Sequence, residues 1–453
     1  TTDQLAERGS QAGPASLSCA GTLALQGVET VIFERRAIAA SCNELVRRLR
    51  QIRSADVTVH PSRHGSLPAC AWRFLFRMQR NRPWIFDMIA TPTVADDMLY
   101  RKVMWRLLPF LFVAYIVNYI DRTNVGFAQL QMKDQLGLGD AAFGLGAGVF
   151  FIGYALFEIP SNLLLARWGA RVTFLRIMIA WGLMSALTAF VTTPLQFYVA
   201  RFLLGVAEAG FAPGVLYYFG LWFPSRHRAQ AMAIFFAAFA AAPILSGPLA
   251  SVIMTYLDGV RSLAGWQWLF ILEAVPAIAL GVAAPFLLTN RPSEADWLSD
   301  DEKRRLQQAL QDDDAVDANR QTLGQAMIDP RVWLMGAIYF LALLGVYALT
   351  FWQPTMLKEL GLNIWSIGFI SIIPAAAGIL ASLAIGRRSD QTGERRMHFA
   401  ISALVGACGL AATTFAATSV PLAIASLTVA TIGIAACMPV FWAIPGQILS
   451  KRA

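Results

Sequence analysis

The chain has 453 residues, of which 56% are hydrophobic and only 15% charged, with a formal net charge of +8. Soluble domains carry about 25% charged residues, so the composition excludes an ordinary soluble protein. The apolar residues come in runs of about twenty, the length that crosses a ~30 Å hydrocarbon core as a helix. The positive charge requires no nucleic-acid partner, because arginines at cytoplasmic helix ends give the same balance. The sequence therefore predicts an all-α membrane protein with several spans.

Residues 1–97 differ from the rest of the chain. They are rich in arginine, contain no lysine, and lack an apolar run of twenty residues. They also lack the ordered regions of a secretory signal, and their acidic residues are unlike a transit peptide. Two interpretations stay open: translation begins at Met88 or Met98 and this segment is foreign to the working protein, or it is a cytoplasmic extension.

From Arg101 onward, apolar runs follow one another regularly. We expect ten membrane helices, at 105–127, 142–163, 172–192, 195–219, 229–254, 267–288, 332–352, 365–386, 399–417 and 420–443. Six lie within 98–288 and four within 332–453. The charged segment 289–331 between the two groups predicts a linker with a short surface helix.

Basic residues are distributed unequally between alternate loops. One set of loops, including the linker, carries most of the arginines, whereas the other holds only Lys133, Arg261 and Lys358. The positive-inside rule therefore predicts that the N-terminus and the central linker are cytoplasmic. The five cysteines show no metal-ligand or redox spacing, so no disulfide framework, metal site or cofactor is expected. A phosphate-cradling loop and a nucleophile elbow are also missing from the sequence, which argues against an enzyme.

Two short loops share glycines and arginines at matching offsets. One follows the second predicted helix ("ARWGARV") and the other follows the eighth ("GRRSDQTGERR"). Glycine permits a tight reversal between helices, and arginine favours the wet interface. Short cytoplasmic loops favour both residues in any case, but recurrence after the second helix of each group indicates an internal repeat. The loop motif comprises Gly169, Arg171, Gly386, Asp390, Gly393 and Arg395.

The loop after the eighth helix resembles the signature Gly-x-x-x-Asp-x-x-Gly-x-Arg of the major facilitator superfamily. The stretches "NYIDRTNVGFA", "ARFLLGVAEAGFAPG", "WFPSRHRAQAMA" and "FWQPTMLK" are similar to its anion:cation symporters, nearest to the tartrate, phthalate and hydroxyphenylacetate permeases. This resemblance covers about residues 98–450 and implies two pseudo-symmetric six-helix bundles. Two departures stand out. Ala166 replaces an acid of the superfamily loop, and the second bundle is expected to be truncated to four helices.

Ionisable residues inside predicted spans are costly, and so they indicate function. Asp121 lies about 24 Å along its helix from Trp105, which predicts a position in the outer half of the membrane. Arg201 and Glu208 are seven residues apart, so they share one helix face about 10 Å apart. Asp121 and Glu208 are predicted to couple transport to protons, a role that the family resemblance also implies.

Guanidinium groups bind carboxylates through paired hydrogen bonds, which makes Arg122 and Arg201 candidate anion ligands. The polar candidates that could join them at the substrate are Asn124, Tyr154 and Gln353. Alternatives stay open for the charges. Asp121 and Arg122 could neutralise each other, Arg201 could pair with Asp121 to hold two helices together, and both arginines could reach the membrane interface. Glu158 and Glu273 are expected to pair with cytoplasmic loop arginines or with backbone.

These features together predict a secondary active transporter of the inner membrane, working by alternating access. Its expected substrate is a small organic anion, such as tartrate, phthalate, hydroxyphenylacetate or a sugar acid, carried with protons. The expected partners are this anion, the proton and the lipid bilayer, without nucleic acid, and the protein is expected to be a monomer. The direction of transport stays open. The alternative is a truncated, non-transporting remnant or a membrane sensor.

Overall fold

The structure is a computed structural model that describes residues 94–316, 328–416 and 418–444. Residues 1–93 of the expected extension 1–97 therefore lie outside the described residues. The linker residue Arg320 and the terminal residues Lys451 and Arg452 also lie outside them. Within the described residues the regular secondary structure is helical, as predicted.

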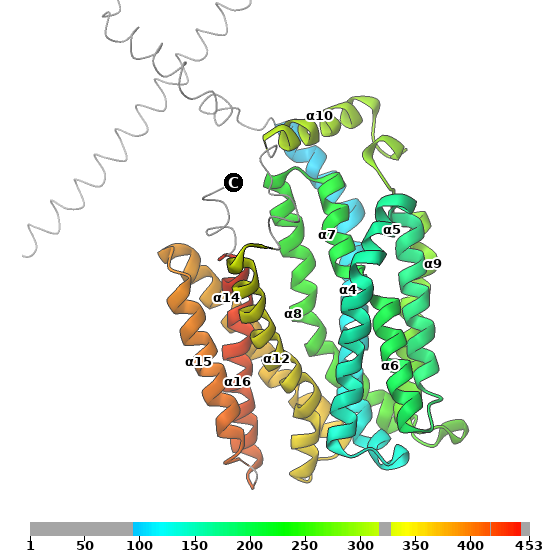
Figure 1. Cartoon of the computed structure of the whole chain (residues 1–453), viewed down its shortest axis with the longest axis vertical. Helices are drawn as coiled ribbons and strands as arrows, with labels where there is room; N and C mark the ends of the chain where they lie inside the picture. The colour runs from blue at the N-terminus through cyan, green and yellow to red at the C-terminus, as the bar shows by residue number, and fades with distance from the viewer. Residues whose placement is uncertain (1–93, 317–327, 417, 445–453) are drawn as a thin grey trace, which may run out of the picture. The chain divides into compact units, whose positions relative to one another are not determined.

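The first group of helices contains the spans expected within 98–288. Its elements are α4 (Val94–Leu136), α5 (Asp140–Thr188), α6 (Pro194–Glu208), α7 (Phe211–Trp222), α8 (Ser225–Tyr256), the short η1 (Val260–Ser262) and α9 (Gly265–Leu287). The connecting segment holds η2 (Pro292–Glu294) and α10 (Asp300–Val316). The second group contains α12 (Pro330–Glu359), α13 (Ile364–Ile370), α14 (Ile372–Thr392), α15 (Arg396–Thr413) and α16 (Val420–Trp442). Figure 1 follows these elements from blue to red along the chain.

Helix α5 contains two of the predicted spans. A straight helix of its 49 residues would extend about 74 Å, more than twice the hydrocarbon thickness. The helix is interrupted at Gly169, whose φ of 79° lies in the left-handed region that favours glycine. Nine helical segments of the described residues are long and apolar enough to span a membrane, with α5 counted once. The ten expected spans are thus accounted for.

Around the break in α5, the loop motif makes the contacts expected of a tight reversal. The Arg171 backbone N–H donates to Asn290 Oδ1 at 3.0 Å, and its Nε donates to the Leu288 carbonyl at 2.6 Å. In the second group, Gly393 ends α14 with a φ of 69°, and Arg395 Nη1 lies 2.6 Å from Asp390 Oδ1. Gly386 differs from expectation because it lies inside α14 rather than at the turn.

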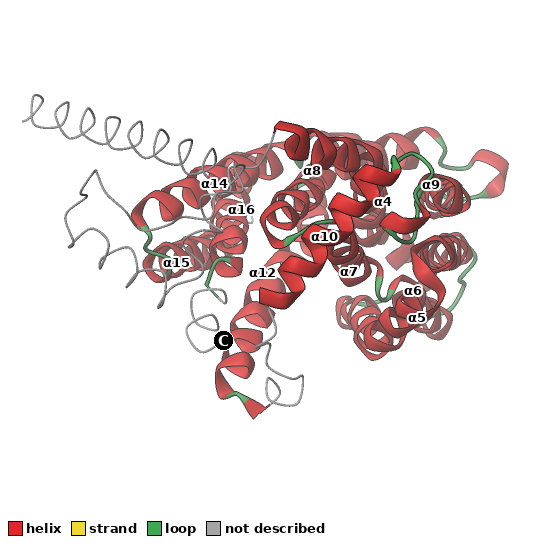
Figure 2. Cartoon of the chain, turned by 90° about the horizontal axis from the view of Figure 1, so that it is seen from above, coloured by secondary structure: helices red, strands yellow, loops and turns green. Residues whose placement is uncertain are grey.

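Two predicted spans are broken helices. The span expected at 195–219 divides into α6 and α7, and the span at 365–386 divides into α13 and α14 at Ser371. The first helix is longer than expected, because α4 continues beyond the apolar run at both ends. Figure 2 shows the helices end-on, with α5, α6 and α9 near one another and α14, α15 and α16 in a second cluster.

Glycines bring helices of the two groups into backbone contact. A Cβ added to Gly126 of α4 would lie 2.5 Å from the Thr350 carbonyl oxygen of α12. A Cβ added to Gly368 of α13 would lie 2.4 Å from the Gly247 carbonyl oxygen of α8. Small residues at such crossings allow close packing, which replaces the hydrophobic driving force that lipid cannot supply. Two hydrogen bonds join α4 to α12 nearby, from Gln129 to the Phe351 carbonyl and from Lys358 to the Leu130 carbonyl.

The predicted surface helix of the linker is confirmed as α10, which lies across one end of the first group (Figure 1). Lys102 Nζ lies 2.8 Å from Glu302 Oε2, and this hydrogen bond holds the pKa of Glu302 below its ordinary value. Arg228 Nη2 lies 3.2 Å from Asp313 Oδ2 at the other end of α10. Leu306 of α10 is fully buried in the apolar core of the first group, so α10 is attached by apolar and ionic contacts together.

Candidate functional site

Buried polar side chains gather where α4, α5, α6 and α9 meet. Each is at most 4% exposed, in a region whose other buried residues are largely apolar. Buried polar groups of this kind are costly unless paired, so their concentration in one place indicates function. We call them the central polar cluster, which comprises Asn118, Asp121, Asn124, Ser185, Arg201, Glu208 and Glu273.

Arg122 and Glu208 form an ion pair at this cluster. Arg122 Nε lies 2.5 Å from Glu208 Oε1, and the Asn118 side-chain amide donates to the same oxygen. The Arg122 guanidinium also lies over the Tyr154 ring, 4.7 Å from its centroid. Tyr154, a predicted substrate ligand, is therefore a neighbour of this pair. Glu208 Oε2 and Arg122 Nη2 are buried without a hydrogen-bond partner among the described residues.

A break in the helix follows directly after Glu208, which is the last residue of α6. Gly210, two residues on, has a φ of 86°, and a Cβ there would lie 2.6 Å from Ser161. Only glycine fits both the backbone conformation and the contact. The glycines and proline of "AGFAPG" indicate packing or bending within the span predicted at 195–219, and the structure places a full break between α6 and α7 at this point.

Asp121 lies apart from the arginine beside it in sequence. Its Oδ1 accepts hydrogen bonds from Ser185 Oγ and, at 3.3 Å, from Asn124 Nδ2. The alternative in which Asp121 and Arg122 neutralise each other is wrong, because Arg122 pairs with Glu208. Adjacent residues on a helix point about 100° apart, so each reaches a different neighbouring helix.

Asn124 joins Asp121 to a third acid. Its Nδ2 donates to Glu273 Oε2 at 2.9 Å, so one amide group connects carboxyls of α4 and α9. The expectation that Glu273 pairs with cytoplasmic arginines or backbone was wrong. Glu273 lies about two turns into α9 from Gly265, and that position puts it against α4 rather than near a loop.

Arg201 lies fully inside the protein, only 1% exposed, with its guanidinium 5.0 Å from the Phe150 ring centroid. The alternative that it reaches the membrane interface is therefore wrong. Among the carboxylates, Asp121 and then Glu208 interact most strongly with its charge. Its Nε and Nη1 atoms have no hydrogen-bond partner among the described residues. A buried guanidinium with spare donors is suited to binding an anion.

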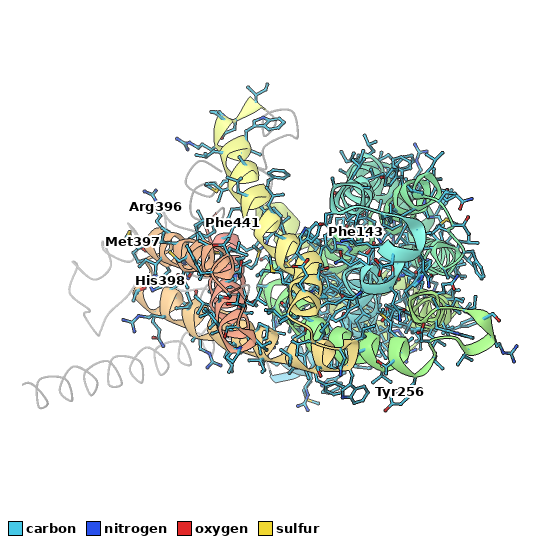
Figure 3. The ribbon with its side chains drawn as sticks, turned by 90° about the horizontal axis from the view of Figure 1, so that it is seen from below. Phe143, Tyr256, Arg396, Met397, His398 and Phe441 are labelled. Carbon is cyan, nitrogen blue, oxygen red and sulfur yellow. The ribbon has the colours of Figure 1, made fainter. Side chains whose placement is uncertain are left out.

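Gln353 lies outside the central polar cluster. Its Nε2 donates to Ser371 Oγ at 3.1 Å, which links α12 to the junction between α13 and α14. His398 also lies apart: its Nδ1 is 2.8 Å from the Glu394 carbonyl oxygen, and Figure 3 shows it with Arg396 and Met397 at one end of α15. Across the described segments, no group of three or more His, Cys, Asp and Glu residues could hold a metal ion.

Long apolar helices surrounding a buried charged cluster define a multi-pass membrane transporter rather than an enzyme. The chain belongs to the Major Facilitator Superfamily, whose profile matches residues 111–453. Solved structures agree on the fold. An inward-facing, occupied bacterial homologue of the human lysosomal transporter Spinster gives a TM-score of 0.62 at 18% identity, covering 78% of this chain and 76% of that one. The Escherichia coli xylose transporter XylE gives 0.60 at 13% identity, covering 77% and 88%.

Relatives with greater sequence similarity are also transporters by name. The metabolite transport protein NicT of Pseudomonas putida is 43% identical over 357 residues, covering 78% of this chain and 82% of that protein. A protein of Agrobacterium vitis named as a tartrate transporter is 43% identical over 359 residues, covering 79% and 82%. A quinolone resistance transporter of Acinetobacter baumannii is 41% identical over 353 residues, covering 77% and 81%. The predicted resemblance to the tartrate permeases is confirmed.

Proposed function

We propose that the chain is a proton-coupled symporter of a small organic anion in the inner membrane. In this proposal the helices of 98–288 and 332–453 form two halves that rock about a shared site, with 289–331 as the cytoplasmic linker. The N-terminus is also cytoplasmic, on the argument that the arginine-rich loops stay inside. The substrate class is a carboxylate such as tartrate, phthalate, hydroxyphenylacetate or a sugar acid.

The observation that carries this proposal is the Arg122–Glu208 ion pair. Its carboxylate is internal, so a substrate carboxylate can take its place on the guanidinium only when Glu208 is neutral. A proton on Glu208 neutralises its negative charge, so the side chain no longer attracts Arg122 as an ion. The Arg122 guanidinium is then free to bind the anion. Proton binding and anion binding then favour one another, which is the thermodynamic requirement for coupling.

Arg201 supplies a second cationic contact. Its Nε and Nη1 atoms, which have no partner among the described residues, lie on different edges of the guanidinium, and each can donate a hydrogen bond to an anionic group of the substrate. Loss of a proton from Asp121 would bring that carboxylate into competition for Arg201, because these two residues interact electrostatically. In this proposal the charge of Glu208 decides whether Arg122 can bind the anion, and the charge of Asp121 does the same for Arg201. A proton can neutralise either acid.

The names of the relatives guide the choice of substrates for a test. Tartrate comes from the Agrobacterium vitis protein, and a quinolone, which also carries a carboxylate, comes from the Acinetobacter baumannii protein. Drug export is therefore the second candidate function.

Uptake into proteoliposomes tests both candidates. Vesicles containing the purified protein would be given an inward proton gradient and labelled tartrate, phthalate, hydroxyphenylacetate, sugar acids or a quinolone. We expect an organic acid to accumulate above its outside concentration and to stop accumulating when a protonophore is added. Uptake that ignores the proton gradient would contradict coupling, and proton-driven movement of the quinolone alone would favour drug export. A lack of any uptake would favour the non-transporting remnant or sensor.

A further inference from the structure

The proposed coupling uses Asp121 and Glu208 and leaves a third buried acid without a role. Glu273 is 4% exposed, and its Oε1 atom has no hydrogen-bond partner among the described residues. It is also the only ionisable residue in the sequence of α9. An isolated carboxylate in such surroundings is costly, so Glu273 needs either a charged or hydrogen-bonding partner or a bound proton.

The contacts of Glu273 connect it to Asp121. Asn124 donates to both acids, at 2.9 Å to Glu273 and 3.3 Å to Asp121. An amide nitrogen carries two hydrogens, so both bonds can exist at once. The ion pairs of the described residues include neither acid, whereas Glu208 has Arg122.

Few other charged residues lie on the helices packed around Asp121 and Glu273. Helix α4 contributes Asp121 and Arg122, and α6 contributes Arg201 and Glu208; Arg122 is already paired with Glu208. The buried part of α5 contributes the neutral Ser185, and α8 carries its charged residues only in its first turn. One guanidinium, Arg201, thus remains to balance two carboxyls, and a second negative charge here is unfavourable.

We propose that Asp121 and Glu273 form an amide-bridged acid pair that shares one exchangeable proton, with Glu273 acting on transport through Asn124 and Asp121. The inference rests on the proposed proton-coupled function and adds Glu273 to it as a positioning residue. In the resting state the proton is bonded to one carboxyl while Asn124 stabilises the other as an anion. On release, that O–H bond breaks, the proton passes to water of the open pathway, and Arg201 balances the charge.

The pH dependence of uptake tests this pairing. Glu273→Gln keeps an oxygen that accepts from Asn124 but removes the second negative charge near Asp121. The Asp121 carboxylate then becomes easier to form, so the pH at half-maximal uptake should fall by about one unit. Glu359→Gln is the matched control, because Glu359 is an exposed glutamate at the end of α12, and its profile should equal that of the wild type.

Infrared titration of the detergent-solubilised protein gives a second readout that requires no transport. The carbonyl stretch of a protonated carboxyl should weaken in Glu273→Gln, and in Asp121→Asn the remaining Glu273 band should change its titration range. An unchanged pH profile together with an unchanged band would overturn the acid pair. If the wild type transports no organic acid, the proposed function fails on its own, while the infrared titration still decides whether the two acids share a proton.

Discussion

Arg122 of α4 and Glu208 of α6 are joined by an ion pair of 2.5 Å, with the glutamate fully buried and the arginine nearly so. The same glutamate closes α6, directly before the left-handed Gly210. The ion pair therefore lies directly beside the break between α6 and α7. A proton that neutralises the Glu208 carboxylate removes this ionic link between α4 and α6.

Glu208→Gln should abolish accumulation while retaining exchange of substrate down its gradient. The amide resembles the protonated acid, so Arg122 stays available to the anion but no proton is carried. Accumulation under a proton gradient and counterflow without one would be measured in the same vesicles. The control is Glu359→Gln, an exposed glutamate at the end of α12, which should keep both activities. Normal accumulation by Glu208→Gln would remove Glu208 from the mechanism.

Arg201→Lys should weaken anion binding without removing the charge. Lysine cannot reproduce the two parallel donors of guanidinium, and losing one hydrogen bond to a charged group costs about 1.5–3 kcal/mol. The KM for the organic acid should therefore rise roughly 10- to 150-fold. Arg176→Lys is the matched control, because Arg176 donates one hydrogen bond to Ser161 Oγ, at 2.6 Å, that lysine can replace. An unaltered KM in Arg201→Lys would exclude Arg201 as a substrate ligand.

Gly210→Ala should destabilise the protein through its backbone. A residue with a Cβ at this φ costs about 1–2 kcal/mol, and the methyl group would also press on Ser161. The apparent midpoint of thermal unfolding in detergent should fall. Gly220→Ala, in the last turn of α7 with no atom within 4 Å of the added Cβ, should leave the midpoint equal or raise it. Equal midpoints for the two variants would refute the strained conformation at Gly210.

Acidic pH should loosen α10 from the first group of helices. The pKa of Glu302 is lowered by its hydrogen bond to Lys102, so the bond stabilises the docked helix above the ordinary glutamate pKa. That contribution is lost as the pH falls through the lowered pKa. Fluorescence of Trp297, which stacks on Trp222 with ring centroids 5.5 Å apart, would report the change. Glu302→Gln should show a weaker acid transition, and an identical transition in that variant would contradict the assignment.

The sequence was sufficient to predict the spans, the linker helix and four of the charged residues that lie together, namely Asp121, Arg122, Arg201 and Glu208. Hydropathy identifies a span, and the cost of a buried charge identifies Asp121, Arg201 and Glu208. The partners of these charges could not be predicted. Spans that are apolar on every face carry little information about their rotation, so nothing in the sequence shows that Arg122 faces α6 while Asp121 faces α5.

The third acid was misjudged for the same reason. Glu273 was expected near cytoplasmic arginines, but its contact depends on how α9 packs against α4, which only the tertiary structure reveals. The residues "AGFAPG" indicate bending of the span, but a full break after Glu208 could not be predicted, because a glycine in an apolar helix is common and costs little when neighbours satisfy the backbone.

The glycine contacts between the two groups bear on the energy of opening. Gly126 against the Thr350 carbonyl and Gly368 against the Gly247 carbonyl bring backbones together with almost no side-chain surface between them. In the proposed rocking of the two groups, parting them at this end breaks the hydrogen bonds from Gln129 to the Phe351 carbonyl and from Lys358 to the Leu130 carbonyl. It also disrupts the buried apolar cluster that contains Phe127 of α4 and Ile367 of α13. A larger residue at either glycine would hold the backbones apart and so favour the arrangement in which the groups are separated here.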